Sequence, residues 1–152
     1  MNTDRSNQVL AVLAKGVTSS AELEKNLDLS QSAASRLLRA LIEQGQVIRL
    51  GSTRGARYGL LRAIGTIGSR WPLRQIDSLG NIQLIGQLHA LASDEYFFLP
   101  SNVNYAALGA VTDSIPYFLQ DQRPGGFLGR AVPQRFPELG LPQRVIDWTD
   151  DH

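Results

Sequence analysis

The stretch over residues 31–44 constrains this chain most, because it has the pattern of a helix with one apolar and one cationic side. Four apolar residues recur at the spacing that places them on one helical face, namely Ala34, Leu37, Leu38 and Leu41. Ser30 is a good N-cap directly before this stretch, and Gly45 is a stop signal directly after it. The opposite face carries small polar residues and then two arginines, with no acid before Glu43. We therefore predict a helix that packs on one side and presents cations on the other.

Two shorter helices are predicted before it. Over residues 5–14, three apolar residues at helical spacing indicate a first helix that ends at Gly16, namely Val9, Val12 and Leu13. Ser19 and Glu22 have the spacing of a capping box, which predicts the start of a second helix. This helix directs Leu23 and Leu27 inward.

A basic hairpin is predicted after the third helix, with strands over 47–50 and 57–60 around a flexible tip at 51–56. Three helices followed by a basic hairpin is the order of a winged helix-turn-helix. The run AELEKNLDLSQSAASRLLRALIEQGQVIRL resembles that superfamily, and the resemblance covers about residues 5–62. It implies a DNA-binding domain, while some winged helices bind proteins instead.

The physical roles on double-stranded operator DNA follow from position. The start of the third helix favours a phosphate, its exposed face reads base edges, and the flanking and wing arginines contact backbone or the minor groove. In that order, the predicted DNA-binding residues are Ser30 and Gln31; Ser32, Ser35 and Arg36; and Arg39, Arg49, Arg54 and Arg57. One such module buries only ~600–1,000 Å² on DNA, so tight binding implies two copies, as a homodimer or through a partner.

Charge is unevenly distributed between the two halves of the 152 residues. Residues 1–70 contain ten Lys or Arg and five Asp or Glu, whereas residues 71–152 contain five and nine. The bland interpretation is a set of solvated faces, and the alternative is an anion-binding front end. The chain has no cysteine, which excludes disulfides, a thiolate zinc site and a cysteine nucleophile. With no long apolar run, we expect a soluble cytoplasmic protein that has no contact with a membrane.

The second half has the pattern of a small antiparallel sheet. We interpret residues 63–72, with two glycines and Pro72, as a linker, and predict strands over 75–77, 82–89 and 95–99. Within 82–89, apolar residues at 82, 84 and 88 oppose polar ones at 83, 87 and 89. The predicted fold class is α+β, with a winged helix-turn-helix over 1–62, a linker over 63–72 and a β-rich subdomain over 73–152.

A second resemblance lies in this subdomain. The segments QIDSLGNIQLIGQLHAL, SIPYFLQDQRPGGFLGRAV and LGLPQRVIDWTDDH resemble the N-terminal region of HipA-family serine/threonine kinases, most closely the YjjJ-like branch. In that branch a winged helix precedes the kinase on one chain. The nucleotide loop, catalytic aspartate and metal-binding acid that follow in such kinases have no counterpart here.

The resemblance implies a DNA-binding antitoxin and autorepressor of a split toxin–antitoxin system, which neutralises a separately encoded HipA-like kinase toxin. Aromatics and arginines dominate binding hot spots. The predicted partner-binding residues are therefore Tyr117, Phe118, Arg123, Phe127, Arg130 and Trp148. For the aromatic residues, burial in the subdomain's own core is the alternative. Two other functions stay open: the N-terminal regulatory fragment of a longer HipA or YjjJ-type kinase, and a small-ligand sensor that regulates DNA binding.

No arrangement of residues names a reaction, so we predict no enzyme activity, no cofactor and no metal site. His89 lies on a predicted strand, where a hydrogen-bonded structural role is expected. Asp150, Asp151 and His152 form a weak candidate for a metal site at the chain end. The Pro-Gly-Gly at 124–126 suggests a phosphate loop, but no lysine follows it, and a tight turn that packs aromatics is expected instead.

Overall fold

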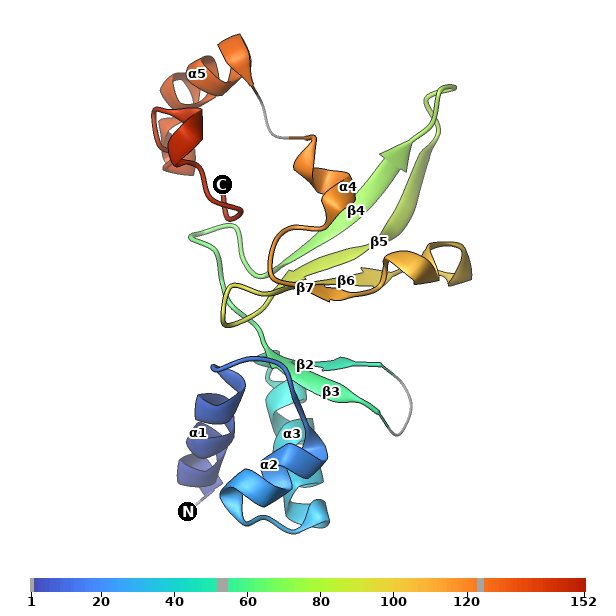
Figure 1. Cartoon of the computed structure of the whole chain (residues 1–152), viewed down its shortest axis with the longest axis vertical. Coiled ribbons are helices and arrows are strands. Elements are labelled where there is room, and N and C mark those ends of the chain that lie inside the picture. Colours follow the sequence, from blue (N-terminus) through green and yellow to red (C-terminus); the bar gives the residue numbers. More distant parts are fainter. Residues whose placement is uncertain (1, 52–54, 123–124) are drawn as a thin grey trace. The chain divides into compact units, whose positions relative to one another are not determined.

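The computed structural model describes residues 2–51, 55–122 and 125–152. The chain forms two compact units, Met1–Val111 and Thr112–His152, which are described separately. The described residues of the first unit form three α-helices, a three-stranded sheet and nearly all of a four-stranded sheet, whose last strand ends at Thr112 (Figure 1). This mixture of helices and antiparallel strands confirms the predicted α+β class.

The N-terminal module has the predicted order of three helices and a hairpin. Its helices are α1 (Asn2–Leu13), α2 (Ser20–Leu27) and α3 (Gln31–Glu43). Its strands are β1 (Thr18–Ser19), β2 (Val47–Leu50) and β3 (Arg57–Leu60), in the sheet order β1-β3-β2. The sequence pattern predicted all of these elements except the short β1, which pairs Thr18 with Tyr58. The winged helix-turn-helix architecture is confirmed.

Side-chain caps fix where the helices of this module begin. The Ser19 backbone N–H donates to the Glu22 carboxylate at 2.8 Å, and the Glu22 N–H donates back to the Ser19 hydroxyl at 3.3 Å. This is the predicted capping box. The Ser30 hydroxyl accepts from the Ala33 N–H at 3.3 Å, which caps α3. A closed apolar core holds the three helices together, formed by Val9, Leu13, Leu23, Leu37, Leu38, Leu41 and Val47.

The second sheet has the order β4-β5-β6-β7. Its strands are β4 (Arg70–Ile76), β5 (Ile82–Ala90), β6 (Tyr96–Pro100) and β7 (Val111–Thr112), and the 3-10 helix η1 (Val103–Leu108) follows β6. β4 begins at Arg70, inside the stretch predicted as a linker. Pro72 is tolerated there because β4 is an edge strand of the sheet.

A β-bulge changes which residues of β5 share a face. The register pairs Leu73 with Gly86 and then Arg74 with Leu84, so Ile85 is the extra residue. Leu88 is opposite Trp71, while Leu84 is opposite Arg74, three residues along β4 and therefore on the other face. The prediction that positions 82, 84 and 88 share one apolar face is wrong, because the bulge reverses the alternation between 84 and 88.

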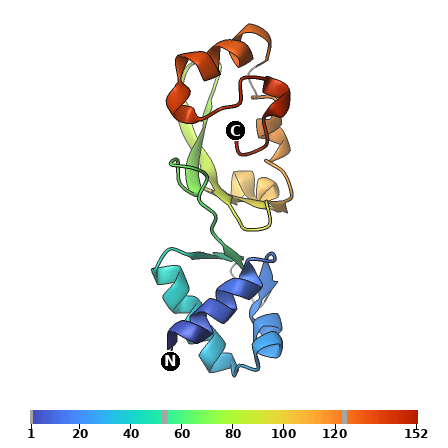
Figure 2. The ribbon, with the colours of Figure 1, turned by 90° about the vertical axis from the view of Figure 1, so that its left-hand side faces the viewer.

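The N-terminal module and the second sheet are joined within the first unit. β2 and β3 lie between the three helices and the β4–β7 sheet in both views (Figures 1 and 2). The Ala92 N–H donates to the Leu60 carbonyl at 2.9 Å, and the Arg62 N–H donates to the Ala90 carbonyl at 3.0 Å. A second apolar cluster spans the joint with Leu50, Leu91 and Phe97. The expected boundary at residue 62 thus falls inside this unit.

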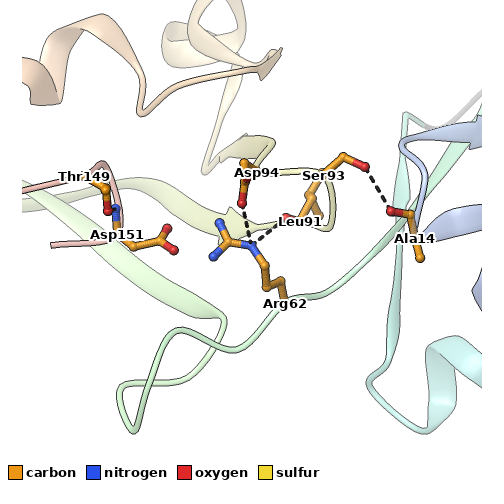
Figure 3. A network of polar contacts seen from close by, with 7 residues as sticks. All are labelled: Ala14, Arg62, Leu91, Ser93, Asp94, Thr149 and Asp151. Carbon is orange, nitrogen blue, oxygen red and sulfur yellow. Dashed lines mark hydrogen bonds and ion pairs between the residues drawn. The ribbon is translucent and has the colours of Figure 1, made fainter.

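Polar contacts reinforce this joint (Figure 3). The Arg62 side chain donates through Nε to the Leu91 carbonyl at 3.0 Å, and the same nitrogen lies 3.9 Å from the Asp94 carboxylate. The Ser93 hydroxyl donates to the Ala14 carbonyl at 2.9 Å, at the end of α1. The turn between β5 and β6 therefore forms polar contacts with two segments of the winged helix, the end of α1 and the residues after β3.

The second unit is mainly helical. It contains α4 (Tyr117–Gln120), α5 (Gly126–Arg135) and the 3-10 helices η2 (Pro137–Leu139) and η3 (Val145–Asp147). The β-rich character expected over 73–152 therefore holds as far as β7. The remainder is mainly helical, because α5 accommodates glycines at its start and Pro133 in its interior. Within the described parts of the chain, no helix combines the length and apolar character that crossing a bilayer requires.

Candidate nucleic-acid interface

The outer face of α3 carries the residues predicted to read bases. Because Ala34, Leu37, Leu38 and Leu41 are buried, the remaining helical positions turn outward. Those exposed positions include Gln31, Ser32, Ser35, Arg36 and Arg39. Small hydroxyl residues thus precede two long cations along one exposed helix face. A helix with this surface suits the major groove, where short residues allow close approach and arginines reach bases and phosphates.

Arg36 and Arg39 keep their hydrogen-bonding groups available. Neither guanidinium forms a hydrogen bond or an ion pair with any other residue in the described ranges 2–51, 55–122 and 125–152. Each offers five N–H donors in a planar fork, which matches a guanine edge or a phosphate. Arg36 also lines a groove of about 320 Å³ between α1 and α3, together with Asn7 and Gln44.

At the start of α3, hydroxyl groups and backbone amides meet. The Ser30 hydroxyl lies 3.2 Å from that of Ser32 while it accepts from the Ala33 N–H. Ser30 therefore fixes the beginning of the helix. Gln31 and Ser32 occupy its first turn, where the helix dipole favours an anion. The contact of these residues with phosphate stays a prediction.

The predicted cations of the hairpin have different surroundings. Arg49 is exposed on β2, opposite Tyr58. The Arg57 guanidinium donates to the Val17 carbonyl at 2.9 Å. The pKa of Glu22 is lowered by the hydrogen bonds from the Ser19 backbone and side chain, and by the positive charge of Arg57. Arg57 is thus turned toward the segment that joins α1 to α2. Arg54 lies outside the described residues.

The residues predicted to bind a protein partner are placed in the second unit. Tyr117, Phe127 and Arg130 are exposed, and Phe118 is half-buried with its ring edge-on to Tyr117 at a centroid distance of 5.6 Å. Arg123 lies outside the described residues.

Trp148 differs from the others. It is only 8 % exposed, and its indole N–H donates to the Pro142 carbonyl at 2.8 Å. Its ring and its donor are both used within the chain, and a contact of Trp148 with a partner stays a prediction. Burial was the alternative interpretation for this residue.

His89 has an environment that sequence reasoning missed. The side chain is 2 % exposed and stacks on Phe97 at a centroid distance of 6.1 Å. Neither ring nitrogen has a hydrogen-bond partner among the described residues, so the predicted hydrogen-bonded role is wrong. Burial, together with the positive charge of Arg70, lowers the pKa of His89 to about 4. The ring is therefore neutral at pH 7.

The candidate metal ligands at the chain end have other partners. The Asp150 carboxylate accepts from the Ile115 N–H at 3.1 Å, and His152 Nδ1 accepts from the Thr149 N–H at 2.8 Å. Among residues 2–51, 55–122 and 125–152, no three His, Asp or Glu side chains are grouped as metal ligands.

Comparison with known proteins adds a family to this geometry. Residues 3–51 match the IclR helix-turn-helix domain, which agrees with α1, α2 and α3. Residues 67–152 match the middle domain of YjjJ-like toxins, and this match covers more than half of the chain. The chain belongs to the YjjJ-like toxin family. It thus joins a DNA-binding helix-turn-helix domain to a toxin-family middle domain, as the resemblances indicated.

A curated relative is similar to most of this sequence. Toxin YjjJ of Escherichia coli (strain K12) is 28 % identical over 157 residues, which include 95 % of this chain. Those residues make up 31 % of that YjjJ protein, so the chain spans about a third of its length. No solved structure matches this sequence.

Proposed function

We propose that this chain is the DNA-binding antitoxin and autorepressor of a split YjjJ-type toxin system. It binds duplex operator DNA through α3 and the wing, and its remaining part holds and neutralises a separately encoded HipA-like serine/threonine kinase. It carries out no catalysis of its own. The family match and the helix-turn-helix domain support a regulator related to toxins, and the antitoxin role and kinase partner go beyond them.

The free cations of α3 are the observation that carries the DNA-binding part of the proposal. An ordinary solvated helix face would pair its arginines with acids at i, i+4 spacing. Arg36 has no acid at this spacing, and Arg39 forms no ion pair with Glu43, four residues further on, within the described residues, so both guanidinium groups are available to a polyanion. Duplex DNA supplies closely spaced phosphates and guanine edges that accept bidentate arginine contacts.

The partner-binding part of the proposal is supported by exposed aromatic side chains. Tyr117 and Phe127 expose large rings, and Arg130 is exposed on the same helix as Phe127. Exposed rings and arginines are the residue types that dominate binding hot spots. A kinase at this surface would be bound mainly through apolar contacts with the two rings, and Arg130 would add directional hydrogen bonds.

The proposal is tested by comparing Arg36→Ala and Arg39→Ala with Arg74→Ala as the control for loss of charge. The probe is a duplex from the region upstream of the gene, titrated alongside a scrambled duplex of equal length. Arg36→Ala is expected to weaken the free energy of binding to the upstream duplex by ~1–3 kcal/mol and to reduce the preference for it over the scrambled duplex. Arg39→Ala should weaken binding to both duplexes and reduce the slope of log affinity against log salt concentration by about 1.

Two results would contradict this function. Equal affinity of the wild type for both duplexes, together with unchanged affinity in both α3 variants, would exclude α3 as a DNA-reading element. If Arg74→Ala lowers the affinity for DNA by the same amount, the loss in the α3 variants is explained by net charge and not by a contact of α3.

A second function is favoured by the length of the curated relative. Toxin YjjJ has more than two thirds of its length outside the matched region, so the chain also fits the N-terminal regulatory part of a longer HipA or YjjJ-type kinase. An antibody to this chain distinguishes the two functions in the native cell. A product of the mass of this chain supports the split system, and a product several times larger supports the longer kinase.

A further inference from the structure

The outer half of the β4–β5 hairpin exposes aliphatic side chains to solvent. In Figure 1 this part of the hairpin diverges from β6 and η1. Four residues have large exposed fractions, namely Ile76 (66 %), Leu79 (86 %), Ile82 (66 %) and Leu84 (49 %). We refer to these four residues as the hairpin surface. Contiguous apolar groups of this kind on a protein exterior mark interaction sites.

The strand register places three of these side chains on one face. Ile76 is directly opposite Ile82, and Leu84 is two residues along β5 from Ile82 and thus on the same side. Gln75 and Gln83 are opposite each other on the reverse side, where the Tyr105 hydroxyl donates to Gln75. The hairpin therefore has one face with glutamines and one mainly aliphatic face, which also carries the exposed Arg74 directly opposite Leu84. Antiparallel strands with this alternation normally cover their apolar face.

The tip of the hairpin is held in one conformation. The Asp77 carboxylate accepts from the backbone N–H groups of Leu79 and Asn81 and from the Asn81 amide, at 2.8 to 2.9 Å. The Asn81 bonds lower the pKa of Asp77, and Gly80 takes a positive φ of 84°. This network presents Leu79 on a preformed turn. A preformed surface loses less conformational freedom on binding than a flexible loop.

We propose that the hairpin surface docks on the HipA-like kinase, as a second contact apart from the aromatic residues of the second unit. This inference rests on the proposed function. The choice of occupant is argued from the relative, in which more than two thirds of the chain accompanies the region matched here. A second copy of this chain is a poorer occupant. The area that four aliphatic side chains can bury falls well below the ~800 Å² per partner of a stable dimer. The hairpin surface therefore suits one part of a larger interface.

The edge of the sheet also argues for a face contact. β4 is the outer strand, and Pro72 within it has no N–H to donate to a neighbouring strand. Extension of the sheet by a second copy is therefore discouraged along part of this edge. The apolar face next to the edge has no such obstacle.

The test replaces aliphatic area without weakening the strands. Ile76→Thr/Ile82→Thr keeps a β-branched residue at both positions and removes apolar surface. The matched control is Gln75→Thr/Gln83→Thr, which changes the directly opposed pair on the polar face. Each full-length variant is titrated against the kinase polypeptide encoded beside this gene, by biolayer interferometry. The apolar pair is expected to raise Kd by about tenfold or more, and the control to change it by less than about twofold.

Each outcome separates the two claims. If the wild type does not bind the kinase, the proposed function fails and this inference fails with it. If the wild type binds and Ile76→Thr/Ile82→Thr binds equally well, only the hairpin surface is wrong. An equal loss in the control pair would assign the effect to the hairpin's stability and overturn the contact. If the wild-type chain alone sediments as a dimer and Ile76→Thr/Ile82→Thr sediments as a monomer, the occupant is a second copy of the chain and the kinase contact is wrong.

Discussion

Acid should destabilise the first unit through His89, whose neutral ring is buried and finds no hydrogen-bond partner for either nitrogen in the part of the chain that the structure describes. Its pKa is about 4 in the folded protein, because burial and the Arg70 charge disfavour the protonated ring. In the unfolded chain the ring is hydrated, and its pKa returns to the ordinary value of 6.5. Between these two values the unfolded state binds more protons than the folded state. Stability therefore falls as the pH is lowered.

The size and the pH window follow from the same two pKa values. The stabilising effect of the neutral ring is fully present above pH 6.5 and is lost progressively as the pH falls toward 4. A fall in pKa from 6.5 to about 4, at about 1.4 kcal/mol per pH unit, corresponds to about 3 to 4 kcal/mol. This is a large part of the ~5–15 kcal/mol by which domains are stable.

Urea unfolding followed by far-ultraviolet circular dichroism measures this loss. Wild type and His89→Leu are compared at pH 7, 6, 5 and 4.5, and leucine removes the titrating ring while it keeps an apolar side chain in the site. We expect the variant to be as stable as the wild type at pH 7 or more stable, because two unsatisfied nitrogens are removed. Its stability should fall less steeply between pH 6.5 and 4. Parallel pH profiles for the two proteins would refute the reasoning.

The remaining predictions concern one cap and one close approach. Ser30→Ala should cost about 1 kcal/mol of stability through loss of the α3 cap, whereas Ser30→Asp should retain it, and equal urea midpoints for the two variants would contradict the cap. Gly86→Ala should cost about 1–3 kcal/mol, because the added methyl group would overlap the Leu99 carbonyl and the Phe98 ring. Gly55→Ala, whose methyl group would meet open space, is the control in thermal unfolding, and an unchanged midpoint for Gly86→Ala would exclude the close contact.

The winged helix was predictable because its signals are local. The capping box at Ser19, the N-cap at Ser30 and the spacing of leucines in α3 each act over a few residues, and each is present as predicted. The same spacing predicts which α3 side chains are exposed. It does not predict that Arg57 donates to Val17, because that hydrogen bond joins residues 40 positions apart.

The second half was harder because its structure depends on distant partners. Pro72 indicates a linker until β5 is known to lie beside it, and the bulge at Ile85 reverses a face that simple alternation assigns. Glycine and proline obscure α5, where Pro133 is accommodated inside the helix. The missing hydrogen-bond partners of His89 also depend on what packs around it. Composition alone gave no sign of the exposed hairpin surface.

The joint between the winged helix and the second sheet has a practical consequence for anyone who wishes to study DNA recognition in a shortened protein. A chain cut after residue 62 would lose Leu91 and Phe97, leaving Leu50 and Val17 open to water and the Leu60 carbonyl without its donor. Such a fragment should be poorly soluble. A truncation placed at the end of the first unit, after Val111, would retain these contacts and is the better starting material for crystallisation with an oligonucleotide.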